Sequence, residues 1–407
     1  MDIAKGLMSE GHEVSIVTGF PNYPSGKLYD GYRLGMFRRE KISDINVIRT
    51  FEFPYHGKRA SGRIVNYLSF MLSAPLAAFF LRNFDMIYVW HPPLTIGVSA
   101  WVLGKVLRAP VVYDIQDIWP ETAVISGLMK SGKMTRLLHR LEKFVYRRMD
   151  HILVVTPGAR ENIEKKGAAR SKISILPQWA DGSLFGNETS KEVSAMRLRE
   201  NWENRFVVLF AGNVGLVQGL DVMLEAAKKV RGTKCLFAII GDGNEKGRLQ
   251  ILVEENGLEN NVRFYERVTP AEVSKYFAAA DVLYVPLKGS ALNEFVIPGK
   301  TYAYLAAGKP ILMATGGAGN RLIQRAGAGL AVEADNVDSL VAGLMKFMAL
   351  DDSAMKEMGA KAKVQFCKHF RMENTIPMYN KLFERIVDGS KTGSSVEPFV
   401  HEFFREG

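Results

Sequence analysis

Short runs rich in Val and Ile recur along the chain, and each ends in turn or cap residues followed by a helical pattern of apolar positions. In the first half these runs are 12–18, 45–49, 86–90, 111–115, 152–155 and 173–176. After a polar break they resume at 206–211, 235–240, 262–265, 282–286, 311–314 and 329–332. Strands that alternate with helices predict parallel sheets covered by helices on both faces. Two such series predict an α/β protein of two Rossmann-like, doubly wound domains.

The polar break at 178–204 marks the expected domain boundary. We therefore expect a first domain over 1–178 and a second over 179–370, with an amphipathic helix beginning at Ser353. Glycine and serine cluster near the end of the chain, which predicts a loose tail over 389–407.

The beginning of the chain departs from the doubly wound pattern. Residues 1–10 have the apolar spacing of a helix, Gly11 ends it, and a strand follows directly. Doubly wound domains place a strand and a glycine loop before such a helix. We therefore expect the first strand of the N-terminal domain to be missing from this sequence.

The segment 64–81 contains no charged residue. Three interpretations fit it: an element lying on an anionic membrane surface, a buried core helix, or a membrane span weakened by Pro75. Basic residues nearby favour the first interpretation, and they are Lys58, Arg59, Arg63 and Arg82.

Composition narrows the class of protein. The net charge of +10 calls for a polyanionic partner, although the basic residues do not form the aromatic-interleaved stripe typical of nucleic-acid binding. Only Cys235 and Cys367 are present, which argues against a disulfide framework. The histidines show no metal-ligand spacing, so we expect no metal site.

Two glycine loops follow strands in the second half. The first precedes a helix that begins near Leu220, and the N-terminus of such a helix offers free N–H groups to phosphate. The second could face a base or ribose, because ligands of open α/β sheets gather at the carboxyl ends of strands. Plain tight turns are the structural alternative for both. The donor-binding candidates in these loops are Gly212, Asn213, Gly215, Gln218, Gly219, Gly241, Asp242 and Gly243.

A third segment begins a helix with Pro298, Gly299 and Lys300. Proline costs nothing in a first helical turn, and free N–H groups together with an ammonium at the positive end of the helix dipole suit a diphosphate. The alternative is a well-capped helix that carries a lysine by chance.

A fourth segment carries Asp117 and Glu121 directly after a buried strand, where catalytic carboxylates tend to lie. Alternatively, Asp117 caps a helix and Trp119 packs in the core. The catalytic candidates are therefore Asp117, Glu121 and Lys300.

In the joint order of these motifs, the chain resembles the family 4 glycosyltransferases, and more narrowly the WbuB-like enzymes of bacterial surface-polysaccharide assembly. The supporting segments are 11–26, 117–121, 212–215, 218–219, 241–243 and 298–300. The resemblance implies a GT-B architecture of two domains facing a cleft, with a C-terminal helix at about 371–388 that packs back on the first domain.

The same resemblance implies a retaining, metal-independent transferase with no cofactor. The donor, a UDP-sugar, is expected in the second domain. The acceptor, a polyprenyl-diphosphate-linked glycan, is expected against the first domain near Asn22 and Tyr23, at the cytoplasmic face of the plasma membrane.

The chain departs from the family pattern at the diphosphate and ribose positions. Asn213 and Gln218 stand where relatives carry Arg and Lys, so we expect Lys300, Arg248 or Lys246 to supply the positive charge. The family's pair of glutamates should fall near Phe295 and Ala303. Both acids are absent there, and Glu294 is one position off.

Two rival functions remain compatible with these residues. A nucleotide-sugar 2-epimerase shares the architecture but needs no acceptor. A non-catalytic, nucleotide-sugar-binding remnant would explain the missing acidic pair and first strand.

Overall fold

The structure is a computed structural model that describes residues 1–405 except 24, 58, 82, 126–128, 130, 131 and 395. It contains two compact units: unit 1 combines Met1–Pro177 with Ile376–Gly407, and unit 2 is Gln178–Thr375. We expected the boundary at 178/179 and a returning helix from about 371. Lys58 and Arg82, two of the basic residues expected beside 64–81, lie outside the described residues.

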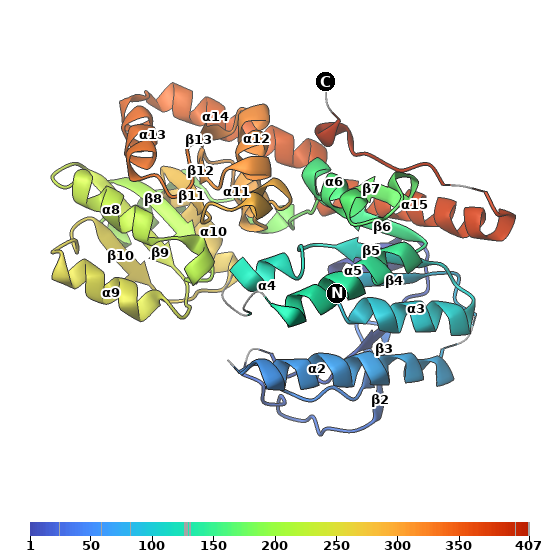
Figure 1. Cartoon of the computed structure of the whole chain (residues 1–407). Helices are drawn as coiled ribbons and strands as arrows, with labels where there is room; N and C mark the ends of the chain where they lie inside the picture. The colour runs from blue at the N-terminus through green and yellow to red at the C-terminus, as the bar shows by residue number, and fades with distance from the viewer. Residues whose placement is uncertain are drawn as a thin grey trace. The chain divides into compact units, whose positions relative to one another are not determined.

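The described strands of unit 1 form two sheets (Figure 1). In the three-stranded sheet, β3 (Ile45–Thr50) pairs parallel with β1 (Ser15–Thr18) and antiparallel with β2 (Phe37–Ile42). The other sheet is parallel, in the order β4 (Ile87–His91), β5 (Val111–Ile115), β6 (His151–Val154) and β7 (Ile173–Ile175). The described strands of this domain thus lie in two sheets, because β1 bonds to β3 while β4 bonds to β5.

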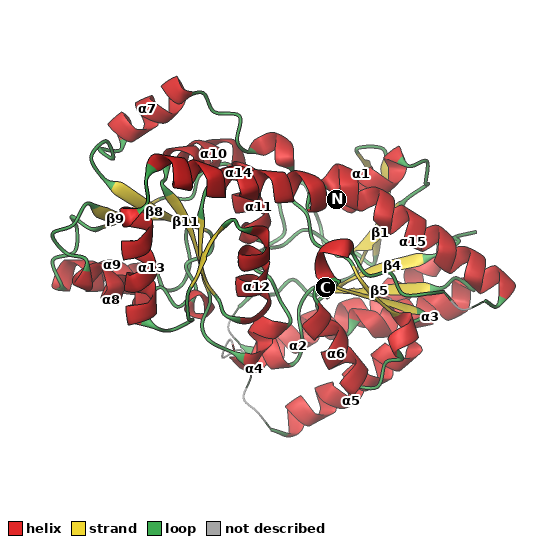
Figure 2. Cartoon of the chain, turned by 90° about the horizontal axis from the view of Figure 1, so that it is seen from above, coloured by secondary structure: helices red, strands yellow, loops and turns green. Residues whose placement is uncertain are grey.

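Helices surround these sheets (Figure 2). They are α1 (Asp2–Ser9), α2 (Ala60–Ser73), η1 (Ala74–Phe79), α3 (Ile96–Leu107), α4 (Glu121–Ile125), α5 (Lys133–Arg148), α6 (Pro157–Lys165), η2 (Arg170–Lys172), α15 (Met372–Thr392) and η6 (Glu402–Phe404).

The end of the chain is not the loose tail that its glycine and serine content predicted. Helix α15 continues to Thr392, and Val400 forms a parallel bridge with Ile175 of the edge strand β7. Ile175 donates its N–H to Phe399 and accepts one from His401. The physical reason is that an edge strand has unpaired backbone groups, and an apolar segment ending in buried Phe403 covers them.

Unit 2 contains one six-stranded parallel sheet (Figure 1). Its order is β10 (Val262–Tyr265), β9 (Cys235–Ile240), β8 (Phe206–Ala211), β11 (Val282–Pro286), β12 (Ile311–Ala314) and β13 (Gly329–Ala331). The four central strands β9, β8, β11 and β12 are almost wholly buried, as expected for a sheet covered on both faces, whereas the edge strands β10 and β13 are mostly half-buried. The chain order reverses between β8 and β11, which is where ligands bind in open α/β sheets.

The helices of unit 2 follow the alternation predicted from the sequence. They are η3 (Gly182–Leu184), α7 (Ser190–Arg199), η4 (Leu216–Gln218), α8 (Asp221–Lys229), α9 (Lys246–Glu255), α10 (Pro270–Ala279), η5 (Ala291–Glu294), α11 (Lys300–Ala307), α12 (Gly317–Ala326), α13 (Val337–Ala349) and α14 (Asp352–His369).

The uncharged segment 64–81 lies mainly on α2 and η1. Leu72 and Phe79 are 69% and 75% exposed, so the core-helix interpretation is wrong for the outer face of these helices. Among the described residues, no helix combines the length and the apolar character that crossing a membrane requires.

Candidate functional site

The two glycine loops of unit 2 pack directly against each other at the carboxyl edge of the sheet. A Cβ atom on Gly241, whose φ is +140°, would lie 2.0 Å from the carbonyl oxygen of Gly212, and one on Gly243 would lie 2.2 Å from that of Val214. Val214 donates its N–H to Asp242, and Glu245 donates to Val214. Gly241 and Gly243 are therefore needed for this close approach, whether or not a ligand is bound.

The hydrogen bonds of the loop after β8 correct the expectation that the Gly212 amide is free to bind phosphate. Gly212 donates its N–H to the carbonyl of Ile240 at 3.0 Å, so this amide is not a free phosphate donor. The N–H groups of Asn213 and Gly215 have no partner among the described residues. Gly219 adopts a left-handed conformation, with φ +63°, between η4 and α8.

Lys300, the first residue of α11, lies against this loop. Its Nζ donates to Gln218 Oε1 at 3.0 Å and lies 3.7 Å from the centroid of the Phe210 ring. A Cβ atom on Gly212 would be 3.1 Å from the same Nζ. Burial lowers the pKa of Lys300 to about 7. The contact brings the loop after β8 together with the helix after β11, across the switch point of the sheet.

The start of α11 adds backbone donors to this ammonium. Thr301 donates its N–H to Pro298, whereas those of Gly299 and Lys300 have no partner among the described residues. A helix N-terminus carries a partial positive charge. The head of α11 therefore combines an ammonium and free N–H groups, which is suited to an anion.

The other charged candidates in unit 2 already have partners. Arg248 lies 2.7 Å from Asp221 and 2.8 Å from Glu245. Lys246 pairs with Glu266 at 2.8 Å. Of the three cations expected to serve the diphosphate, Lys300 is thus the one without a carboxylate partner among the described residues.

Two acidic candidates of unit 2 also make local contacts. Glu294, which we considered for ribose binding, pairs with Arg321 of α12 at 2.6 Å. Exposed Asp242 accepts the N–H of Gly243 at 2.8 Å. Neither contact points to a ligand, so both residues remain predictions.

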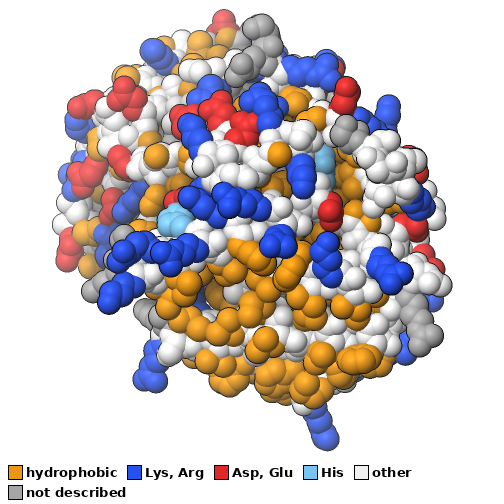
Figure 3. Space-filling model, turned by 45° about the vertical axis from the view of Figure 1, so that its right-hand side comes forward, with side chains coloured by type: hydrophobic (Ala, Val, Ile, Leu, Met, Phe, Trp, Pro, Cys, Tyr) orange, Lys and Arg blue, Asp and Glu red, His pale blue; other side chains and the backbone are white. Residues whose placement is uncertain are grey.

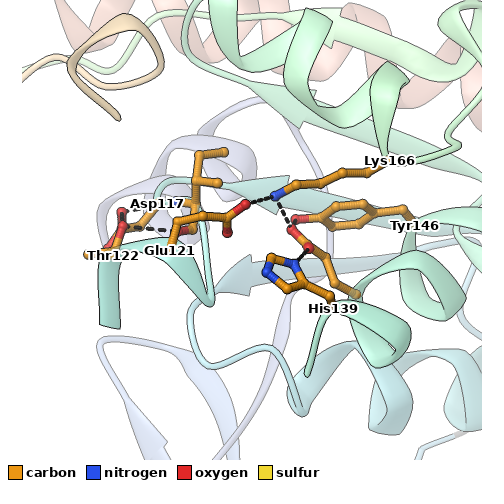
Figure 4. A network of polar contacts seen from close by, with 8 residues as sticks. Asp117, Glu121, Thr122, His139, Tyr146 and Lys166 are labelled. Carbon is orange, nitrogen blue, oxygen red and sulfur yellow. Dashed lines mark hydrogen bonds and ion pairs between the residues drawn. The ribbon is translucent and has the colours of Figure 1, made fainter. Parts of the chain in front are cut away.

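The acidic candidates of unit 1 belong to a polar network after β5 (Figure 4). Asp117 Oδ1 accepts the N–H of Ile118 at 2.9 Å and the hydroxyl of Thr122 at 2.6 Å. Neither bond is a helix cap, because neither is a backbone N–H from the first turn of α4; together they fix the loop that leads into α4. Its Oδ2 has no partner among the described residues, and burial raises the pKa of the carboxyl.

Lys166 links the second acidic candidate to a buried glutamate. Its Nζ lies 2.6 Å from both Glu121 and Glu142 (Figure 4). The Glu142 side chain is fully buried and also accepts the hydroxyl of Tyr146 at 2.9 Å. Burial raises the pKa of Glu142, and Lys166 opposes that shift.

The same network contains a group with metal-ligand spacing. The ligand atoms of Glu121, His139 and Glu142 lie within 4.8 Å of one another. The Lys166 ammonium already contacts both carboxylates, so the protein itself offsets part of their negative charge.

His91, at the end of β4, was missed by the sequence analysis. It is fully buried, and its ring lies close to the backbone of Asp117, although neither ring nitrogen makes a well-aligned hydrogen bond within the described part of the chain. Burial and the nearby charge of Lys166 lower its pKa to about 3, so the ring is neutral at physiological pH. Its position after a buried strand was the available signal, as it was for Asp117.

The acceptor candidates lie in the loop after β1. Asn22 is 4% exposed and donates to the carbonyl of Phe20, while its own Oδ1 is buried without a described partner. Tyr23 is exposed and contacts His56 edge to face. Glu52, also missed, accepts from Asn66 at 2.7 Å, and burial raises its pKa. The loop after β1 and the loop after β3 thus provide polar groups at one edge of unit 1.

An open depression of about 620 Å³ lies elsewhere in unit 1. Its lining includes Phe20, Tyr32 and Arg38 and none of the candidate site residues. We base the site on the contacts of Lys300, because a depression alone does not identify chemistry.

Two α/β units with polar groups at the carboxyl edges of parallel strands define a two-domain, Rossmann-like protein with candidate ligand sites at those edges. The Glycosyl transferase 4-like domain family matches residues 1–179, and the family Glycosyl transferases group 1 matches residues 195–365. The chain belongs to the family 4 glycosyltransferases and has the GT-B fold.

Individual relatives agree with this family. The chain is 27% identical to WcaI of Escherichia coli (strain K12), named for colanic acid biosynthesis, over 86% of this chain and 87% of that protein. It is 28% identical to WbjE of Pseudomonas aeruginosa, named as a glycosyltransferase, over 69% of this chain and 70% of that protein.

Solved structures show the same fold. Sucrose-phosphate synthase from Thermosynechococcus elongatus matches with a TM-score of 0.71 and 16% identity, over 95% of this chain and 92% of that chain. Anabaena HepE in complex with UDP matches with a TM-score of 0.65 and 14% identity, over 79% of this chain and 84% of that chain. At these identities the likeness concerns the fold alone.

Proposed function

We propose that the enzyme transfers a sugar, with retention, from a UDP-sugar to a polyprenyl-diphosphate-linked glycan during surface-polysaccharide biosynthesis. The name of the relative WcaI supports the polysaccharide process, and the UDP complex of HepE supports the donor class. The lipid-linked acceptor would place the reaction at the inner face of the plasma membrane.

The position of Lys300 carries this proposal. Among the described residues it has no carboxylate partner, and it lies at the switch point of the sheet, at the head of a helix whose first N–H groups are likewise unpaired there. When the sugar–phosphate bond breaks, the leaving UDP gains negative charge. Preorganised donors aimed at that charge lower the barrier, and in this protein Lys300 and the N–H groups of Gly299 and Lys300 would supply them.

No metal is needed for this charge stabilisation, because the ammonium and the helix N-terminus provide it. Asp117 would use its unoccupied Oδ2 to orient a hydroxyl group of the acceptor or of the donor sugar. Glu121, which Lys166 holds, would act as a positioning residue for the same loop.

The variant Lys300→Ala tests the proposal. Loss of one charge-stabilising donor should lower turnover by about 10²-fold or more. The measurement is UDP release from a panel of UDP-hexoses in the presence of lipid-linked glycans extracted from bacterial membranes.

Arg248→Ala is the matched control. Arg248 lies on the same side of unit 2 but is neutralised by two acids, so we expect turnover within about threefold of the wild type. Normal turnover of Lys300→Ala, or an equal loss in both variants, contradicts the assignment.

A further inference from the structure

An exposed apolar stripe covers one side of α2 and η1. Ile64, Leu68, Leu72 and Leu76 follow one another at four-residue spacing, all are exposed, and Phe79 continues the stripe. Surface helices of globular domains normally place polar side chains on such a face. A contiguous apolar surface of this kind indicates a binding surface rather than ordinary exposure.

A cationic stripe covers the outer side of α5. Its five members are all exposed and are spaced alternately three and four positions apart, so they share one helical face: Lys133, Arg136, Arg140, Lys143 and Arg147. The single acid on this helix, Glu142, is buried against Lys166. None of the five forms an ion pair with a described residue, so the positive charge of the stripe is not compensated.

Helix α3 connects the two stripes within unit 1. It contacts both α2 and α5, and the three helices lie one below another in Figure 1. Figure 3 shows a broad hydrophobic area on one face, with Lys and Arg side chains along its upper edge.

The apolar stripe and the cationic stripe, taken together, indicate which class of partner this face binds. An anionic bilayer offers phosphate head groups to the cations and an acyl boundary to the apolar side chains, at adjacent depths. A purely apolar partner would leave the cationic stripe unmatched, whereas nucleic acid would leave the apolar stripe in water.

We propose that the α2–η1 apolar stripe and the α5 cationic stripe together form the face by which this enzyme binds an anionic lipid bilayer. The inference deepens the proposed function, since it assigns to named residues the membrane contact that a lipid-linked acceptor requires. The α5 stripe was not among the basic residues that the sequence analysis associated with the membrane.

Vesicle co-sedimentation of the purified full chain tests this surface. We expect binding to vesicles of phosphatidylcholine mixed with phosphatidylglycerol, and much weaker binding to phosphatidylcholine alone. Arg140→Glu/Lys143→Glu should lower partition into the anionic vesicles at least ~20-fold, because each cation near such a surface contributes about fivefold. Leu72→Ser/Phe79→Ser should lower partition at least ~10-fold, since both side chains lose their burial in lipid.

The control variants use exposed residues of unit 2. Lys346→Glu/Lys356→Glu changes the net charge by the same amount, and Ile251→Ser removes an apolar side chain that is 55% exposed. Both should bind vesicles within about twofold of the wild type. High salt should weaken wild-type binding and leave that of Arg140→Glu/Lys143→Glu nearly unchanged.

Three outcomes overturn the proposal: no binding of the wild type to anionic vesicles, equal losses in the stripe and control variants, or conversion of a dimer to a monomer by Leu72→Ser/Phe79→Ser with unchanged vesicle binding. Calorimetry with UDP separates this inference from the proposed function. The stripe variants should bind UDP normally, so failure of UDP binding in every protein would reject the donor assignment while the vesicle result stands.

Discussion

Two partly buried lysines of this enzyme, Lys166 in unit 1 and Lys300 in unit 2, have opposite surroundings. Lys166 lies 2.6 Å from each of two carboxylates. Lys300 contacts an amide oxygen and an aromatic ring. Moving a charge out of water is costly unless it is paired. The difference indicates that Lys166 completes a structural network, whereas Lys300 is held ready for an anion supplied by a ligand.

The free energies of unfolding of Lys166→Met and Lys300→Met should show the largest difference between these two roles. Lys166→Met leaves Glu142 buried without its cation, so we expect a loss of about 3 kcal/mol or more in the free energy of unfolding. Lys300→Met removes an unpaired, partly buried charge and should be neutral or stabilising by about 1 kcal/mol.

Urea unfolding at neutral pH, followed by tryptophan fluorescence and circular dichroism, measures both variants. Glu142→Gln/Lys166→Met is the control, because removing both charges should recover most of the lost stability. Equal destabilisation by Lys166→Met and Lys300→Met would show that the two lysines do not differ in the way their contacts indicate.

A variant of Asp117, in the acidic loop of unit 1, should have a smaller effect and tests whether this carboxylate acts on the substrate. Asp117→Asn keeps an oxygen acceptor for Ile118 and Thr122 but removes the negative charge. If Asp117 acts on the substrate as proposed, turnover should fall about tenfold while the free energy of unfolding changes by less than about 1 kcal/mol. A loss of stability with unchanged turnover per folded molecule would leave Asp117 only a structural role in the loop before α4.

Much of this architecture follows from local patterns. The parallel strands of unit 2, the helix that begins at Lys300 and the loops at the switch point were all predictable, because strand ends and helix starts have local signals. The family also followed from the order of the motifs. The contacts that each candidate side chain makes in the folded chain did not follow from local patterns.

The contacts of the candidate residues could not be read from the sequence, and one physical cause explains this. The Gly212 amide is consumed by Ile240, Arg248 is neutralised by Asp221, and Glu121 is held by Lys166. Each of these contacts joins elements that are brought together only by folding. Composition likewise predicted a loose C-terminal tail, but the edge of β7 provides pairing that the tail's own sequence cannot reveal.

Calorimetry of UDP binding in buffers of different ionisation enthalpy tests the central claim most directly. Burial lowers the pKa of free Lys300 to about 7, so at pH 8 most molecules hold a neutral amine. A bound diphosphate stabilises the ammonium and raises that pKa, so wild-type protein should take up close to ~1 proton per UDP at pH 8, and its affinity should fall as the pH rises above about 7. Lys300→Ala should bind more weakly and take up no proton, while Arg248→Ala should resemble the wild type. Proton uptake that is absent from the wild type, or that persists in Lys300→Ala, would contradict a diphosphate held by Lys300 at the head of α11.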